Sequence, residues 1–301
     1  MKHIFMYAMA AMALMSVTSC NEREMDLTPA QAKSESEGMG YIRINATTDD
    51  AVTRATITGP GSSYTWYATV QDKDSNYKWP SSGTAFTAIT DALNSVAIPA
   101  GNCTVKVRNF LDLTTALNQT PLSGSSDNDN TKYGAPYWVG EKTEEVIAGA
   151  VATQITVPCG TPQNAKLTVA QSDFIGTNMA SNVTIHLTDD TYSRDINFTY
   201  SNGAFNNGGV AYFAATEAVQ FYITYNYGNS SNLRYPAENE NPNYRTIKMG
   251  GRGTSNLLTI KSNGNGTISL TIETTDFTAA TKETTTLITF DALDGSIVNN
   301  N

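Results

Sequence analysis

The sequence is short of the residues on which catalysis and nucleic-acid binding usually depend. Its 301 residues include two histidines and three cysteines, and 19 Lys and Arg stand against 28 Asp and Glu, which gives a net charge of −9. Binding to a phosphate backbone needs a basic surface, and this chain does not supply one. The hydrophobic share of 40% is enough for a buried core, and the length suits two domains. The composition argues against nucleic-acid binding and against a disordered chain.

Histidine is nearly absent from the part of the chain expected to fold. His3 lies in the leader described below, which leaves His186 between Ile185 and Leu187 in an alternating run. A Ser-His-Asp or Cys-His mechanism would have to use that ring, and a zinc ion would find few ligands. We therefore expect no catalytic residue, no metal and no cofactor.

The first 19 residues have the pattern of a secretory signal. Lys2 precedes an apolar run over residues 4–14, which is too short to span a bilayer, and small residues follow. The stretch Val17-Thr18-Ser19-Cys20 resembles the bacterial lipobox, in which the cysteine is acylated and becomes the new N-terminus. The resemblance implies a lipid anchor at Cys20; ordinary cleavage beside a chance cysteine is the alternative. Residues 20–38 are mostly polar, and we expect them to form a flexible tether.

The remaining sequence consists of short runs in which apolar and polar residues alternate, a pattern typical of strands with one wet face. Expected strands include residues 41–45, 64–70, 103–107, 166–169, 183–187 and 219–225. Helical periodicity is limited to residues 84–95 and 112–118. The sequence therefore predicts an all-β fold.

Two β-hairpins are marked by Asn-Gly turns, which supply positive φ angles. Residues 201–203 join 198–200 to 204–205, and residues 262–266 join 257–261 to 268–272. So many short strands suit two β-sandwiches in series better than one. Two prolines in residues 158–162 mark a boundary, although they could equally form a corner within one domain. The expected organisation is a signal peptide (1–19), a lipidated tether (20–38), an N-terminal β-sandwich (39–160) and a C-terminal β-sandwich (161–301).

Cys103 and Cys159 leave two interpretations open. An exported protein can hold a disulfide, which needs Cα atoms about 5.5 to 6 Å apart. Both cysteines also border apolar strands, which suits two small buried core residues. Residues 72–76 open like a calcium loop but lack its glycine and later glutamate, which favours a solvated loop. Asp189 and Asp190 are neighbours on an expected strand, so their side chains point to opposite faces and do not form an acid–base pair.

Five tyrosines fall within 23 residues, amid Asn, Ser and Pro: Tyr222, Tyr225, Tyr227, Tyr235 and Tyr244. If exposed, they would form a platform for a sugar or a protein partner. The alternative, which the alternation favours, is that strand tyrosines such as Tyr225 and Tyr227 cover the edge of the core.

Several segments together resemble the fimbrillin-like lipoproteins of Bacteroidales, and a domain family of unknown function found in such cell-surface proteins. The matching segments, in the family's order, are residues 40–44, 52–55, 98–105, 135–140, 155–159, 164–169 and 210–213. The acidic cluster in residues 21–26 is similar to the surface-export signal of such lipoproteins. The chain departs from the family at Cys103, where an aromatic residue is usual, and in a long insert over residues 111–133.

The resemblance implies two transthyretin-like β-sandwiches, lipoprotein export and, for pilin members, assembly by strand exchange after an arginine-specific cut. Arg54 matches the position of that cut, which would leave Ala55 as the new N-terminus. Loss of the leading strand would open a groove for a partner's extended segment, and residues 284–290 would be the donor strand. The alternative is that Arg54 is an ordinary loop residue and the subunit keeps its lipid.

These observations predict a non-enzymatic surface lipoprotein of the outer membrane, acting as a fimbrial (pilus) subunit, anchor or adhesin. Its expected partners are other fimbrial subunits or host surface proteins and glycans. A glycan-binding lipoprotein of a polysaccharide-uptake system, using the five tyrosines, is the alternative, and an enzyme is the least favoured class.

Intact-mass analysis of the protein from the surface of its native cells tests the two fates of the N-terminus. A chain from Cys20 to Asn301 with added lipid would identify a permanent anchor and would contradict strand exchange after cleavage. A chain that begins at Ala55 without lipid would identify a processed, polymerising subunit.

Overall fold

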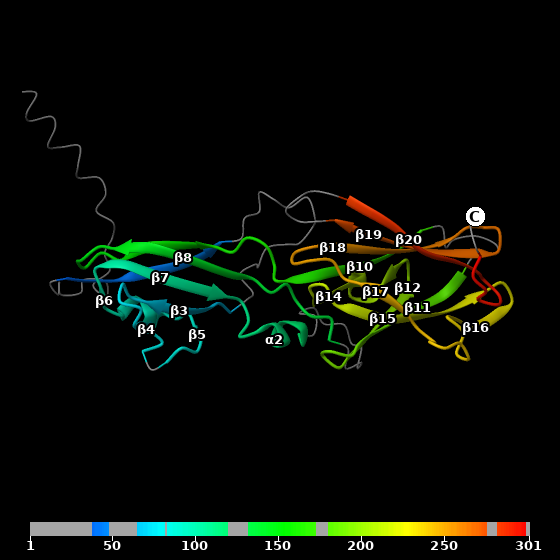
Figure 1. Ribbon diagram of the computed structural model, residues 1–301, viewed down its shortest axis with the longest axis horizontal. Coiled ribbons are helices and arrows are strands. Elements are labelled where there is room, and N and C mark those ends of the chain that lie inside the picture. The colour runs from blue at the N-terminus through cyan, green and yellow to red at the C-terminus, as the bar shows by residue number, and fades with distance from the viewer. Residues whose placement is uncertain are drawn as a thin grey trace, which may run out of the picture.

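The computed structural model describes residues 38–47, 65–81, 83–119, 132–172, 180–275 and 282–298. Cys20, Arg54 and Ala55 lie outside these ranges, as do the expected signal peptide and most of the tether. Nearly all the regular structure is β, in two groups of sheets placed end to end along the long axis of the molecule (Figure 1). The expectation of an all-β fold is confirmed.

The first group of sheets is built on the antiparallel order β4-β3-β7-β8, with β5 beside β3. Its strands are β3 (Tyr67–Gln71), β4 (Tyr77–Trp79), β5 (Thr87–Ala88), β7 (Gly101–Arg108) and β8 (Val139–Val146). Two further pairs complete the group. β1 (Met39–Gly40) is antiparallel to β6 (Ile98–Pro99), and β2 (Ile42–Thr47) is parallel to β9 (Thr153–Pro158).

The second group contains two larger sheets. One has the order β14-β10-β18-β19-β20 and the other β13-β12-β11-β15-β16, with β17 also paired to β15. The first comprises β10 (Asn164–Ser172), β14 (Val210–Ala214), β18 (Ser255–Ser262), β19 (Thr267–Thr275) and β20 (Lys282–Asp291). The second comprises β11 (Ala180–Asp189), β12 (Arg194–Ser201), β13 (Ala204–Phe205), β15 (Ala218–Tyr227), β16 (Ser230–Tyr235) and β17 (Arg245–Lys248).

Strict alternation explains why these segments are strands. In β7 the side chains of Cys103, Val105 and Val107 are buried while those between them are not. In β15 every second residue from Val219 to Tyr227 is buried. Successive strand side chains point to opposite faces, so one face packs on the core and the other meets solvent.

The two Asn-Gly hairpins form as expected. Asn202 and Gly203 both have positive φ, 52° and 89°, and join β12 to β13. Gly264 and Gly266, with φ of 73° and 87°, join β18 to β19. These turns match the twist of the strands they connect, which fixes the register of each pair.

The buried apolar side chains fall into two clusters, one for each group of sheets. The first contains residues between Ile42 and Cys159, and the second contains residues between Ala165 and Ala292. Tyr133 is the exception, because it precedes Cys159 in the sequence but packs in the second cluster. The segment around Tyr133 therefore belongs to one half by sequence and to the other by packing.

Helices are short. The expected helix over residues 84–95 is reduced to the 3-10 helix η4 (Asp91–Ser95), because Thr87 and Ala88 pair with β3 as a strand. The expected helix over 112–118 is α2 (Leu113–Leu117), whose first turn is capped by the Asp112 carboxylate accepting from the Thr115 N–H at 2.7 Å. In the described part of the chain, no helix combines the length and hydropathy that a membrane crossing requires.

Phe290 in β20 offers a test of the second core. Its ring is fully buried and stacks on Tyr235 with centroids 3.9 Å apart. Phe290→Ala should lower the free energy of unfolding by about 3–5 kcal/mol, because it leaves a cavity, as measured by urea denaturation. Leu293→Ala, at a site 58% exposed, is the control and should change it by less than about 0.5 kcal/mol. Equal effects of the two substitutions would contradict this packing.

Candidate functional site

The five tyrosines do not form an exposed platform. Tyr225, Tyr227 and Tyr235 are buried in the second core, while Tyr222 and Tyr244 are half-buried. Burial raises the pKa of the Tyr225 phenol, whose O–H donates to the Ala292 carbonyl at 3.1 Å. The platform interpretation is wrong for the three buried rings, because alternation in β15 and the end of β16 turn them inward.

Tyr222 lies in a ladder of stacked side chains across the outer face of one sheet. Its ring stacks on His186 of β11, with centroids 4.3 Å apart, and the Arg234 guanidinium of β16 lies 4.1 Å from its centroid. Because β15 lies between β11 and β16, the two partners approach the ring from opposite sides. Both ring faces are therefore occupied, which leaves no face on which a sugar could stack.

His186 takes part in this ladder through both ring nitrogens. Nδ1 lies 2.8 Å from Asn197 Oδ1, and Nε2 lies 3.2 Å from Thr224 Oγ1. Burial and the nearby Arg234 guanidinium lower the pKa of His186, although the bond to Asn197 opposes this. The histidine joins three neighbouring strands, β12, β11 and β15, and has no carboxylate among these partners.

Cys103 and Cys159 are free thiols, fully buried in the first core. Burial raises the pKa of Cys103 to about 11 and that of Cys159 to about 12. Of the two interpretations, small core residues describe their surroundings and a disulfide does not. A thiol with so high a pKa is a poor nucleophile at neutral pH.

The calcium-like segment at residues 72–76 is a closed turn between β3 and β4. Asp72 Oδ1 accepts from the backbone N–H groups of Asp74 and Asn76, both at 2.9 Å, and Oδ2 pairs with Lys78 at 3.1 Å. Burial works to raise the pKa of Asp72, but these partners outweigh it and hold the pKa below its ordinary value. The carboxylate is committed to the turn, and the described residues contain no His, Cys, Asp and Glu cluster suited to a metal ion.

Two buried asparagines hold the segment that leads from one half to the other. Asn109 accepts from the Trp138 N–H at 2.7 Å and donates to the Pro136 carbonyl at 2.9 Å. Asn164 accepts from the Tyr137 N–H at 3.0 Å and donates to the Ala135 carbonyl at 2.8 Å. Each amide supplies the donor and the acceptor that a neighbouring strand would supply, so residues 135–138 stay extended between the two halves.

A buried arginine fastens the long insert to the second half. The Arg194 Nε donates to Asp189 Oδ2 at 2.9 Å, and Nη1 donates to the carbonyls of Leu117, Lys132 and Tyr212 at 3.1, 3.4 and 2.9 Å. Both charged side chains are almost fully buried. Leu117 and Lys132 lie in the two described parts of the insert, residues 111–119 and 132–133, so this one arginine fixes both parts to the second half.

Glu217 stands beside the Asp189 carboxylate of this cluster. Burial and the neighbouring Asp189 carboxylate raise the pKa of Glu217 to about 7, against the hydrogen bonds it accepts. One of these comes from the Ala214 N–H at 3.1 Å. The site therefore favours the neutral form of Glu217 below neutral pH.

The second half also presents an open sheet edge. β20 is the last strand in its sheet and pairs only with β19 among the described residues. The chain after β20 folds back to cover one end of the free edge. The Asp291 N–H donates to the Ser296 carbonyl at 2.8 Å, and the Val298 N–H donates to the Thr289 carbonyl at 2.9 Å. Residues 282–288 keep an unpaired edge in the described structure.

Sequence reasoning missed Arg194, Asn109 and Asn164, and treated residues 111–133 only as an insert. The signal for the arginine was present in part, because Asp189 and Asp190 were expected on opposite faces. Asp189 is fully buried and Asp190 points to solvent, where it accepts from Gln220. What the sequence did not show is which distant carbonyls the arginine would reach.

Comparisons with known proteins place the chain as follows. A family model described as a domain of unknown function (DUF4493) matches residues 38–290, a span that includes strands of every sheet. Among proteins with curated descriptions, none matches this chain. Solved structures similar to it include the tip fimbrial protein Mfa3 from Porphyromonas gingivalis, at 12% identity and a TM-score of 0.40, covering 79% of this chain and 99% of that one. Another is a fimbrial assembly protein from Parabacteroides distasonis, at 9% identity and a TM-score of 0.37, covering 74% and 90%.

The raised pKa of Glu217 predicts a pH dependence of stability. The folded protein keeps this proton up to about pH 7, whereas the unfolded chain releases it near 4.5. The contribution of the protonated Glu217 to the free energy of unfolding is therefore complete below pH 4.5 and is lost as the pH rises to about 7. Between pH 5 and 7, the titration of Glu217 should lower the free energy of unfolding of the wild-type protein by an amount on the order of 1 kcal/mol. Glu217→Gln should not show this decrease, as measured by urea denaturation at several pH values.

The matched control is Glu145→Gln, at an exposed site on β8, which should leave the slope of stability against pH unchanged. His186 contributes a slope of the opposite sign, because its pKa is lowered in the folded protein. The difference between variant and wild type is therefore the quantity to compare. If the free energy of unfolding changed with pH in the same way for Glu217→Gln and for the wild-type protein, the raised pKa of Glu217 would be contradicted.

Proposed function

The chain belongs to the family of the domain of unknown function DUF4493, and on this premise we propose that it is a non-enzymatic surface lipoprotein. In this proposal it acts as a fimbrial subunit or anchor in cell adhesion. Its partners are other subunits or host surface proteins and glycans, which it meets through β-sheet contacts.

The observation that carries the proposal is the free edge of β20. Along residues 282–288, backbone donors and acceptors on one side have no strand beside them in the described structure. Such an edge binds an extended segment of another chain through main-chain hydrogen bonds. Because the tail already covers residues 289–291, a guest segment would lie along the first part of the strand.

The edge also bears on how residues 284–290 could serve as a donor strand. Here they are paired to β19 from Thr284 to Phe290, with one bulge at Leu287. Donation to another subunit would require release from β19, whereas reception of a guest on the free edge would not. We infer that reception is the easier of the two contacts.

We further propose two transthyretin-like domains, residues 39–160 and 161–301, behind a signal peptide and a tether lipidated at Cys20 that holds them at the outer membrane. The two separate clusters of buried side chains support this division. A cut after Arg54 would remove β1 and β2 together with the tether. Since Ile42 is fully buried and β2 pairs with β9, the cut would open a groove along β9 in the first domain.

The glycan-uptake alternative has less support. Three of its five tyrosines are core residues, and Tyr222 has both ring faces covered. The glycan-uptake alternative would gain support if the protein bound a polysaccharide in a broad panel and if Tyr222→Ala abolished that binding.

Hydrogen exchange tests the proposed contact. In the purified chain, amides on the free edge of residues 282–288 should exchange quickly. In the assembled cell-surface fraction of native cells they should exchange at least about tenfold more slowly, because a partner strand covers them. The control is β10, which lies between β14 and β18 and should be protected in both samples.

Two results would count against the proposal in different ways. Unchanged exchange at residues 282–288 would exclude β20 as the contact. A strain that lacks the gene and adheres as well as its parent would exclude the adhesive function itself.

A further inference from the structure

One end of the first half carries an unusual apolar turn. The connection between β8 and β9, residues 147–152, reads Ile-Ala-Gly-Ala-Val-Ala and contains no polar side chain. Ile147 and Val151 are each 70% exposed, the highest values among the large hydrophobic residues of the described chain. Sheet connections normally carry polar residues, so this turn exposes aliphatic side chains where polar ones are usual, a feature that marks contact surfaces.

The turn is held firmly in place. The Gly149 N–H donates to the Met39 carbonyl at 2.9 Å, and the Thr153 N–H donates to the Tyr41 carbonyl at 2.8 Å. A side chain at Gly40 would collide with the Ile147 carbonyl, since its Cβ would lie 2.2 Å from that oxygen. The close approach of β1 therefore holds the backbone of the turn that exposes Ile147 and Val151.

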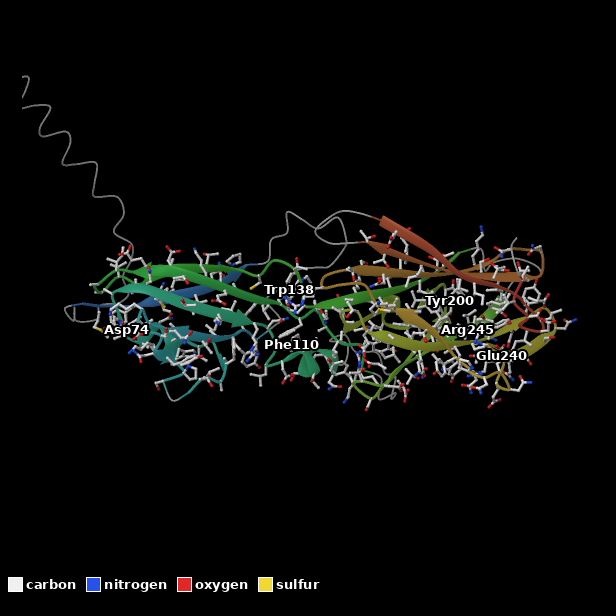
Figure 2. The ribbon with its side chains drawn as sticks, in the orientation of Figure 1. Asp74, Phe110, Trp138, Tyr200, Glu240 and Arg245 are labelled. Carbon is white, nitrogen blue, oxygen red and sulfur yellow. The ribbon has the colours of Figure 1, made fainter. Side chains whose placement is uncertain are left out.

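The same bonds place the turn where the described chain begins. Gly38 accepts from the Ala100 N–H at 2.8 Å, and β1 follows directly. Figure 1 shows this end of the molecule opposite the end that carries the C-terminus, and Figure 2 places the loop residue Asp74 at the same end. Gly38 lies eighteen positions after Cys20, a reach of at most about 65 Å. An acyl anchor at Cys20 would therefore keep this end of the molecule, and not the opposite one, within that distance of the bilayer.

Charge does not supply the attraction to lipid, because the nearby lysines are paired and Glu145, two residues before Ile147, is an exposed acidic residue on β8. Lys142 pairs with Glu144 at 2.7 Å on β8, and Lys73 pairs with Asp74 at 2.8 Å in the adjacent hairpin. The chain as a whole is acidic, so attraction to anionic headgroups does not drive the contact. Burial of aliphatic side chains is the remaining force.

We propose that residues 147–152 form a membrane-docking tip that inserts Ile147 and Val151 into the acyl boundary of the bilayer that holds the lipid anchor. This inference rests on the proposed lipidation of Cys20. The tip would set the orientation of the molecule on the membrane, so that the second half projects away from the surface. Anchor and tip together provide two points of attachment, which one flexible tether does not.

The test uses the full lipidated protein in phosphatidylcholine vesicles. Ile147→Cys, Val151→Cys and, as the control at the opposite end, Leu293→Cys are labelled with an environment-sensitive fluorophore. The buried Cys103 and Cys159 thiols, with pKa values of about 11 and 12, do not compete for the label. Nitroxide-labelled lipids should quench the fluorophore at positions 147 and 151 and shift its emission to the blue, and should leave position 293 unchanged.

The possible failures are distinguishable. If the protein floats with the vesicles but the labels at positions 147 and 151 are not quenched, insertion of residues 147–152 is contradicted and lipidation of Cys20 is not. If the protein does not float, the anchor itself fails and the inference fails with it. Energy transfer between labels at position 147 of different molecules in the absence of vesicles would assign the turn to a second copy of the chain and overturn the membrane contact.

Discussion

The relation between the two halves of the molecule depends on one buried ion pair. Arg194 is held by Asp189, and its remaining donors go to carbonyl groups of α2, of the end of the insert and of β14. Removal of one partner from such a pair leaves an uncompensated buried charge, at a cost of about 3–5 kcal/mol. If the insert left the second half, the ion pair would remain, but Nη1 would lose the carbonyls of Leu117 and Lys132 and keep only that of Tyr212. The described parts of the insert, residues 111–119 and 132–133, therefore help to hold the two halves together, although the sequence shows them only as a loop.

Asn109 and Asn164 complete the joint by a different means. They bracket residues 135–138 from opposite sides, one from the first half and one from the first strand of the second. An aliphatic residue at either position would leave backbone groups buried without partners. Because the two amides act on adjacent residues of one extended segment, displacement of either half strains hydrogen bonds made by the other.

Much of the fold could be predicted from the sequence, and much of the site could not. Alternation located the strands, and two Asn-Gly turns located the hairpins, because both signals are local. The burial of Tyr225 and Tyr227 also follows from alternation, and composition alone made them look like a binding surface. The contacts of Arg194 and of the two asparagines join residues far apart in the chain, and no local pattern encodes those distances. The apolar composition of residues 147–152 can be read from the sequence. The proposed membrane contact depends on the end of the molecule at which the turn lies, and only the structure shows this.

The parallel pairing of β2 with β9 has a mechanical consequence. β2 runs inward from the end where the described chain begins, and β9 runs beside it in the same direction toward the second half. A pull between a tethered N-terminus and a bound distal half would draw the two strands in opposite directions along their length. The rungs between Ile42–Thr47 and Thr153–Pro158 would then share the load in shear, instead of opening one after another as in a hairpin pulled from its free ends. The fold thus places a pair of strands loaded in shear between the point of attachment and the rest of the molecule.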